Sequence, residues 1–132
     1  MTIVGFNFTK LVAEKKRPVK GKINIKNNVS IKNISESKLA IDAKKKALKF
    51  DFVYTSSYEP GVGLIEIEGE TIFLADEKVA KETLSKWKKE KKAPSQIMRE
   101  LMNHILTRCN VEAIVLSKDI NLPAPIPLPK MK

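Results

Sequence analysis

The chain has 132 residues, of which 42% are hydrophobic and 30% charged, and its net charge at pH 7 is +10. This length lies in the usual range of one domain, about 100–150 residues, and the mixed composition excludes a disordered chain. The apolar runs fall short of the roughly 20 residues of a membrane-spanning helix, and the opening residues lack the basic start and apolar middle of a secretion signal. We therefore expect one domain, residues 1–132, that works in the cytoplasm.

The residues that carry most enzyme chemistry are scarce. His104 is the sole histidine and Cys109 the sole cysteine, and their spacing on one expected helix suits a thiolate–imidazole pair poorly. The motifs of phosphate-binding loops, dinucleotide-binding folds, zinc proteases and serine hydrolases do not occur. A single cysteine also excludes an internal disulfide and a cysteine metal cluster. We expect no enzyme activity, no catalytic residue, no metal and no cofactor.

The first strand is predicted near the start of the chain by a period of two, which is typical of a strand with one buried face. Its apolar positions share one parity and are Val4, Phe6, Phe8 and Val12. A second strand is predicted between Val19 and Ile34, where Ile23 and Ile25 alternate with polar residues. We expect a bulge or bend at Asn27-Asn28, and a bulge or the strand's end where the parity breaks near Ser35.

Two further alternating segments predict the third and fourth strands. The third carries Leu48, Phe50, Phe52 and Tyr54 on one face, and turn-forming residues 56–61 follow it. In the fourth, Ile65 and Ile67 alternate with glutamates, and Gly69 is expected to mark a bulge or tight turn. Residues 37–46 read either as a charged loop or as a continuing edge strand.

Helical spacing begins at Asp76, which is a suitable N-cap for a first helix anchored to the sheet by Trp87. A second helix is expected to start at a Ser95 cap and to stop near Asn110, after about four turns, with a further helical turn or a short strand beyond it. The last segment alternates prolines with apolar residues, so it must be extended. The predicted fold is α+β: antiparallel strands in residues 1–75, helices packed on one side in 76–119, and an extended proline-rich tail in 120–132.

This order of elements, with three local matches, resembles the SecB export-chaperone family and its SecB-like relatives. Residues 6–14 (FNFTKLVAE) are similar to the family's first strand, where aromatic and polar residues alternate. Residues 65–73 (IEIEGETIF) resemble its fourth strand, which passes through a glycine into an Ile-Phe pair. Residues 94–122, which end in Ile-Asn-Leu, resemble its main helix and the loop that follows.

The resemblance implies a four-stranded antiparallel sheet whose helix supports subunit packing, in dimers that can pair into tetramers. It also implies long apolar grooves that hold unfolded polypeptides without nucleotide or metal, for protein transport or, in some relatives, for toxin–antitoxin systems. The chain departs from the family in two ways. Its net charge is +10, whereas the export chaperone meets its motor ATPase through an acidic surface, and a proline-rich tail replaces the family's last helix.

We therefore expect a holdase chaperone or adaptor, a homo-oligomer (dimer or tetramer), that binds unfolded or extended polypeptide in an apolar groove. A four-turn helix would span about 24 Å and strands of twelve or more residues about 40 Å, which leaves apolar sheet uncovered. The candidate polypeptide-binding residues belong to the long alternating faces and are Ile23, Ile25, Phe50, Phe52, Ile65 and Ile67. The helix stripe that would hold the sheet or a partner subunit is Ile97, Leu101 and Ile105.

The basic residues leave an alternative open, a nucleic-acid-binding module that contacts phosphates without reading sequence. They are almost all lysines, and lysine lacks the bidentate geometry that suits base readout. The candidate residues form two clusters: Lys44, Lys45 and Lys46, and then Lys88, Lys89, Lys91 and Lys92. This reading predicts an affinity that falls steeply with salt. A third reading is a purely structural oligomer subunit that binds neither class of partner.

Overall fold

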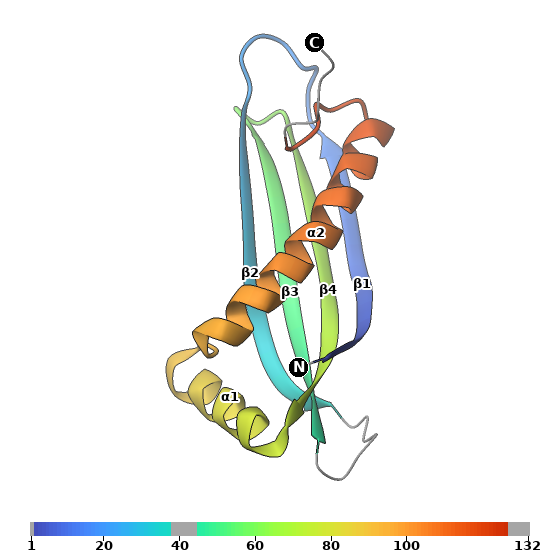
Figure 1. Ribbon diagram of the computed structural model, residues 1–132. Helices are drawn as coiled ribbons and strands as arrows, with labels where there is room; N and C mark the ends of the chain where they lie inside the picture. The colour runs from blue at the N-terminus through green and yellow to red at the C-terminus, as the bar shows by residue number, and fades with distance from the viewer. Residues whose placement is uncertain (1, 38–44, 127–132) are drawn as a thin grey trace, which may run out of the picture.

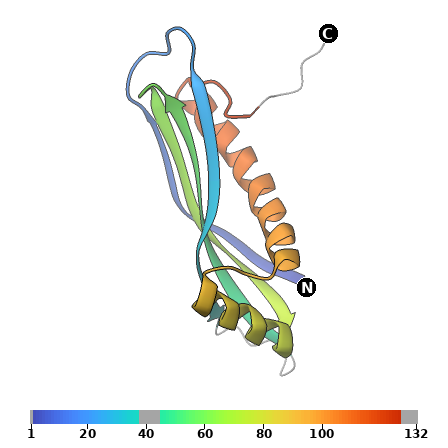
Figure 2. The same ribbon diagram turned by 90° about the vertical axis from the view of Figure 1, so that its left-hand side faces the viewer.

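The computed structural model describes residues 2–37 and 45–126. Within them the elements are β1 (Thr2–Lys15), β2 (Asn24–Ser37), β3 (Lys45–Glu59), β4 (Gly63–Asp76), α1 (Glu77–Glu90) and α2 (Ser95–Asp119). The strands form one antiparallel sheet in the order β1-β4-β3-β2. In Figure 1, α2 crosses one face of the sheet diagonally and α1 lies at its lower end, and Figure 2 shows the opposite face without a helix. The predicted α+β fold is confirmed.

β1 and β2 follow each other in the chain but lie at opposite edges of the sheet. Residues 16–23 carry the chain from one edge of the sheet to the other, past the turn between β3 and β4 (Figure 1). The amide of Lys16 donates to the carbonyl of Val62 at 2.8 Å, and the Arg17 guanidinium donates to the carbonyl of Pro60. These bonds attach the connection to the central hairpin.

The two central strands provide the core of the sheet. Every second side chain of β3 and β4 faces the helices and is buried, as the alternation predicted. The largest of these are Leu48, Phe50, Phe52, Tyr54, Tyr58, Ile65, Ile67 and Phe73. From α2 they are covered by a row that contains Ile97, Leu101, Ile105, Cys109 and Ala113.

The irregularities of the strands differ from the predicted ones. Gly69 lies in an unbroken stretch of β4, and the bulge sits opposite it, at Thr9 of β1. A second bulge at Val4 shifts the parity again, so β1 does not keep the single predicted alternation. In β2 the bulge falls at Lys32, which accounts for the parity break before Ser35. The Asn27-Asn28 pair instead stays in register with β3, and the Asn27 side chain accepts a hydrogen bond from Ser56 of that strand.

The main helix is longer than predicted. Asn110 does not end it, because Ala113 and Ser117 continue the buried row, and the helix runs for 25 residues. At 1.5 Å per residue it spans about 37 Å, close to the length of the strands. Asp76 is the N-cap residue of α1, as predicted, although its side chain makes no capping bond. The N-cap of α2 is Pro94, so the predicted cap Ser95 is already the first helical residue. The stretch 37–46 lies mostly outside the described residues.

Gly69 is a position where the core has no room for a side chain. A Cβ atom there would lie 2.5 Å from the carbonyl oxygen of Asn7 and 2.6 Å from Cζ of Phe52. We expect Gly69→Ala to lower the free energy of unfolding by about 1–3 kcal/mol, because backbone or ring must move. Urea denaturation measures this. The matched control is Gly5→Ala in the neighbouring strand, where the nearest atom would be an ordinary 3.7 Å away. Equal losses in both variants would contradict the packing argument.

Cys109 is a buried residue of α2 whose thiol should be inert. Burial raises its pKa to about 12, with a smaller effect from the charge of Glu112. At pH 8 the reactive thiolate should therefore be scarce. We expect a disulfide reagent to modify the folded chain at least about a thousandfold more slowly than the urea-unfolded chain. Comparable rates in the two states would show that the site opens readily.

Candidate functional site: an apolar strip along β1 and α2

Four of the predicted polypeptide-binding residues are core residues in this structure. Phe50, Phe52, Ile65 and Ile67 are 0% exposed. The alternating face was identified correctly, but it is the face that the long α2 covers, so these side chains cannot contact a client while the helix is packed. The helix residues Ile97, Leu101 and Ile105 lie in the same core, directly on the sheet.

The other two candidates lie at the start of β2. Ile23 and Ile25 are half-buried and pack at the margin of the core. Ile25 is paired with Tyr58 of β3. They are the part of the predicted set that is near the surface.

An exposed apolar strip, which the parity argument missed, lies on the other edge of the sheet. The two bulges of β1 bring Leu11 opposite Ile67 and Ile3 opposite Phe73, so both face the helix side. They are 44% and 39% exposed. On α2 the exposed apolar residues are Val111 at 61% and Val115 at 43%. We call Ile3, Leu11, Val111 and Val115, with Phe6 between β1 and α2, the apolar strip.

Phe6 connects β1 to α2 within the strip. Its ring stacks on Phe52 at a centroid distance of 5.3 Å and meets Phe8 edge-on at 5.1 Å. From α2, the His104 ring approaches to 5.3 Å and the Arg108 guanidinium lies 4.6 Å from the ring centroid. Beyond this contact, α2 and β1 run toward the same end of the molecule (Figure 1). Val111 and Val115 lie two residues from the buried positions Cys109, Ala113 and Ser117, so they face outward from α2. The apolar repeat of α2 does not mark these two valines, because four-residue spacing places them on the exposed row of Asn103 and Thr107.

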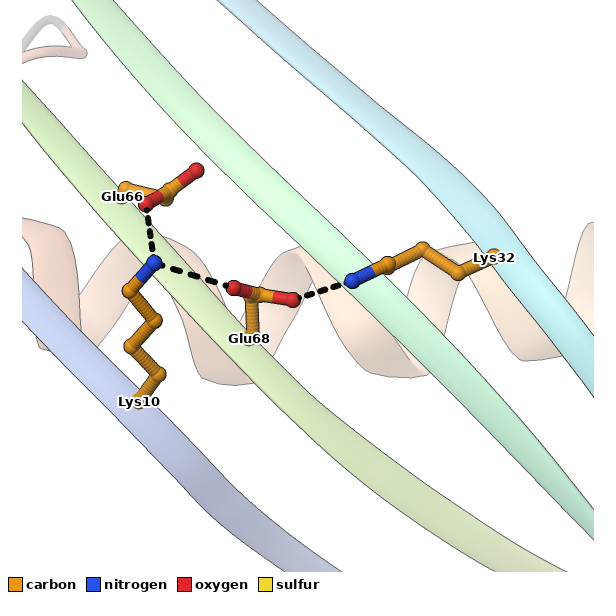
Figure 3. Close-up of polar contacts among 4 residues, drawn as sticks. All are labelled: Lys10, Lys32, Glu66 and Glu68. Carbon is orange, nitrogen blue, oxygen red and sulfur yellow. Dashed lines mark hydrogen bonds and ion pairs between the residues drawn. The ribbon is translucent and has the colours of Figure 1, made fainter.

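The opposite face of the sheet is charged. Lys10 lies 2.9 Å from Glu66 and 3.4 Å from Glu68, and Lys32 lies 2.5 Å from Glu68 (Figure 3). The hydrogen bond from Lys32, followed by that from Lys10, lowers the pKa of Glu68. The hydrogen bond to Glu66 raises the pKa of Lys10. These paired, solvated ions make the central part of this face polar.

The predicted phosphate-binding lysines lie at the α1 end of the molecule. Lys44 is outside the described residues, Lys45 is exposed at the start of β3, and Lys46 pairs with Glu36 at 3.4 Å. The second cluster is exposed at the end of α1 and consists of Lys88, Lys89, Lys91 and Lys92.

Trp87, within that second cluster, points inward. Its indole Nε1 donates to Asn33 Oδ1 at 3.3 Å, and its ring is 8% exposed. Only Lys91 lies over the ring, at 5.5 Å, among the described cations. The residue therefore anchors α1 to the sheet, as predicted, and does not offer a surface on which a base could stack.

The chain has a structural neighbour among solved proteins. No protein-family model matches it, and no curated protein matches it in sequence. The fold is similar to that of the SecB-like chaperone Rv1957 of Mycobacterium tuberculosis, solved in complex with a ChAD peptide from the antitoxin HigA1 (Rv1956). The TM-score is 0.55 at 10% identity, over 98% of this chain and 89% of that one. The similarity establishes a distant SecB-like fold.

The helices of the described ranges, 2–37 and 45–126, were also compared with the requirements of a membrane span. None of them combines the necessary length with the necessary apolar composition.

His104 should make the stability of the fold depend on pH. Its Nε2 atom is buried and has no hydrogen-bond partner among the described residues, and burial, then the charge of Arg108, lowers its pKa. The unfolded chain takes up a proton near the ordinary pKa of 6.5. Neutral His104 therefore costs the folded state nothing above that pH. As the pH falls below it, the unfolded chain gains protons and the free energy of unfolding decreases. We expect the urea concentration at the midpoint of unfolding to decrease as the pH is lowered from 7.5 to 5.5.

The control variant is His104→Phe, which keeps an aromatic ring beside Phe6 and cannot titrate. Its urea midpoint should change little over the same pH range. A variant that loses stability with pH as steeply as the wild-type chain would show that another group is responsible.

Proposed function

We propose that this protein binds extended segments of unfolded polypeptide along the apolar strip, as a holdase or adaptor that catalyses no reaction. The observation that carries the proposal is the exposure of Leu11, Val111 and Val115 beside an edge strand. Exposed apolar surface on a folded chain can serve as an interaction site, and these side chains provide it on β1 and α2. The proposed function is the one expected from the sequence, but the proposed site is the apolar strip at the edge of β1 and not the buried face of β3 and β4.

The strip suits clients of varied sequence. Its side chains are aliphatic or aromatic, and burial of apolar area contributes about 25 cal/mol per Å² without directional requirements. A client therefore gains affinity from many small contacts, whatever its exact residues. The Arg108 guanidinium beside Phe6 adds a positive group at the strip, and the net charge of +10 speeds encounters with acidic segments.

The edge of β1 limits how a client pairs with the backbone. An open strand edge can accept an additional strand, but bulges interrupt such pairing. β1 is bulged at Val4 and Thr9, so its longest stretch that pairs with β4 without a shift runs only from Lys10 to Lys15. Backbone pairing is thus restricted to a short stretch, and contacts to side chains provide most of the affinity. This arrangement favours reversible holding over growth of a continuous sheet.

The structural neighbour supports the proposal. The SecB-like chaperone was solved with a peptide from an antitoxin. A shared fold with a protein that binds a peptide favours a polypeptide partner here too. It does not specify the client, and a role in transport or in a toxin–antitoxin system is not part of the proposal.

The test is binding of a permanently unfolded client, reduced and carboxymethylated α-lactalbumin, followed by fluorescence anisotropy. Leu11→Glu and Val111→Glu should each weaken binding about tenfold, because each removes apolar contact and places a charge on the strip. Both positions are exposed, so the fold should tolerate the changes. The matched control is Val19→Glu, at a 38% exposed position in the connection between β1 and β2. Equal weakening in all three variants would exclude the strip as the site.

Salt separates this function from the nucleic-acid alternative. Between low salt and about 0.3 M, client binding to an apolar strip should change little, whereas binding of a DNA oligonucleotide through lysines should fall steeply. Lys88→Glu/Lys89→Glu should abolish only the second kind of binding. A wild-type chain that binds the oligonucleotide and no client at either salt would reject the holdase proposal.

Self-association is also a proposal at this point. A dimer or tetramer would bury apolar surface of the same kind, so light scattering should accompany each binding titration. If the wild-type chain is oligomeric and the Leu11→Glu variant is monomeric but still binds the client, the strip is the contact between copies and not the client site.

A further inference from the structure

The segment after α2 folds back onto the sheet. Asn121 adopts a left-handed φ of 58° and turns the chain, and the amide of Leu122 donates to the carbonyl of Ser117 at 2.9 Å. Leu122 is buried, with Cδ1 3.2 Å from where a Cβ of Gly63 would lie. Pro125 is buried as well. The helix end thus delivers an extended, proline-containing segment to the ends of β2 and β3.

Two strands hold that segment through its carbonyl groups. Tyr58 Oη of β3 donates to the carbonyl of Pro123 at 2.6 Å. Asn27 Nδ2 of β2 donates to the carbonyl of Pro125 at 2.9 Å. The two accepting carbonyls are separated by one residue, which matches the repeat of an extended chain laid across two strands.

The donors are oriented by the strands themselves. Ser56 Oγ donates to Asn27 Oδ1 at 2.7 Å and lies 3.1 Å from Tyr54 Oη. A serine hydroxyl has one hydrogen, so the Tyr54 hydroxyl is the donor in the second contact. With its oxygen engaged by Ser56, the Asn27 amide must direct its NH₂ group outward. Burial raises the pKa of Tyr58 to about 12, so its hydroxyl remains a donor at neutral pH.

These contacts have the chemistry of a peptide-recognition site. Both hydrogen bonds use carbonyl oxygens of the bound segment, and neither needs its N–H groups. Proline lacks that N–H, and its fixed φ favours the extended form, so a proline-containing ligand loses little entropy on binding. Pockets that combine aromatic rings with side-chain donors bind polyproline segments in this way.

We propose that Asn27, Tyr54, Ser56 and Tyr58 form a binding subsite for extended, proline-containing polypeptide, and that residues 123–126 of the chain occupy it in cis. The proposal rests on the proposed function in one respect: a client that reaches the subsite must displace the segment. Ile25 pairs with Tyr58, so the subsite adjoins one of the two candidate residues that the sequence predicted on β2.

The occupied subsite lowers the affinity for any competing ligand. A tethered segment competes at a high effective concentration, because one turn joins it to α2. Apparent affinity then scales with the fraction of molecules in which the segment is released. Raising that fraction, without any change in the subsite, should strengthen binding in trans.

The test variant is full-length Pro123→Gly/Pro125→Gly, which leaves the four subsite residues intact. Glycine increases the freedom of the released segment, so its release should become about tenfold more favourable. The matched control is Pro18→Gly, at an exposed proline in the connection between β1 and β2. The probe is a fluorescein-labelled peptide with the sequence of residues 122–127, LPAPIP, and a second peptide carries glycine at its prolines.

We expect the double variant to bind LPAPIP about tenfold more tightly than the wild-type and Pro18→Gly chains, and the glycine peptide to bind more weakly. Adding Asn27→Ala to the double variant should remove most of the gain. If the wild-type chain, the control and the double variant bind LPAPIP equally, or none binds it, the subsite proposal is overturned. Circular dichroism confirms that each variant is folded.

Client binding separates this proposal from the proposed function. Carboxymethylated α-lactalbumin should bind the double variant more tightly than the wild-type chain. If the client binds both chains equally, the competition in cis is rejected and the apolar strip stands. If no chain binds the client while the double variant still binds LPAPIP, the holdase function is rejected and the subsite stands.

Discussion

Phe52 packs over Gly69 at the centre of the sheet, and the stacking of Phe6 on the Phe52 ring joins the edge strand to this contact. The missing side chain of Gly69 leaves room for the Phe52 ring, and Phe6 stacks on that ring from the edge strand. Phe6 in turn touches His104 and Arg108 of α2. One small residue on β4 therefore determines how β1, β3 and the main helix meet. Because the centre of the face is filled in this way, both proposed binding surfaces of the described residues lie at its margins.

The two margins differ in chemistry. Along β1 the surface is aliphatic and gives contact without direction, whereas at the ends of β2 and β3 a row of hydroxyl and amide groups gives directed hydrogen bonds. An extended chain could use both surfaces. The apolar contacts along β1 would provide affinity for any sequence, and the hydrogen bonds at β2 and β3 would favour an extended, proline-containing conformation. Both surfaces lie on the helix side, opposite the face on which Lys10, Glu66 and Glu68 pair.

The sequence predicted the central strands and the buried row of α2 because each depends on a local period. Phe50, Phe52, Ile65 and Ile67 repeat every second residue, and that repeat identifies a covered face without saying what covers it. What covers it is a helix of 25 residues, which leaves little of the face open. The bulges at Val4 and Thr9 could not be predicted, because they depend on the partner strand, and they decide that Leu11 faces the helix side. The hydrogen bonds of Asn27 and Tyr58 join residues far apart in the chain, which no local pattern records.

The strand order also governs how the chain folds during synthesis. β1 is made first, yet its partner is β4, so the two must wait for the whole of β2 and β3 before they can pair. Contacts between distant segments form slowly, because a long loop has to close first. Until then the nascent β1 exposes Phe6, Phe8 and Leu11 together. A protein proposed to protect unfolded chains thus begins its own existence with an unprotected apolar segment, and the β3–β4 hairpin is the first complete surface that can shelter it.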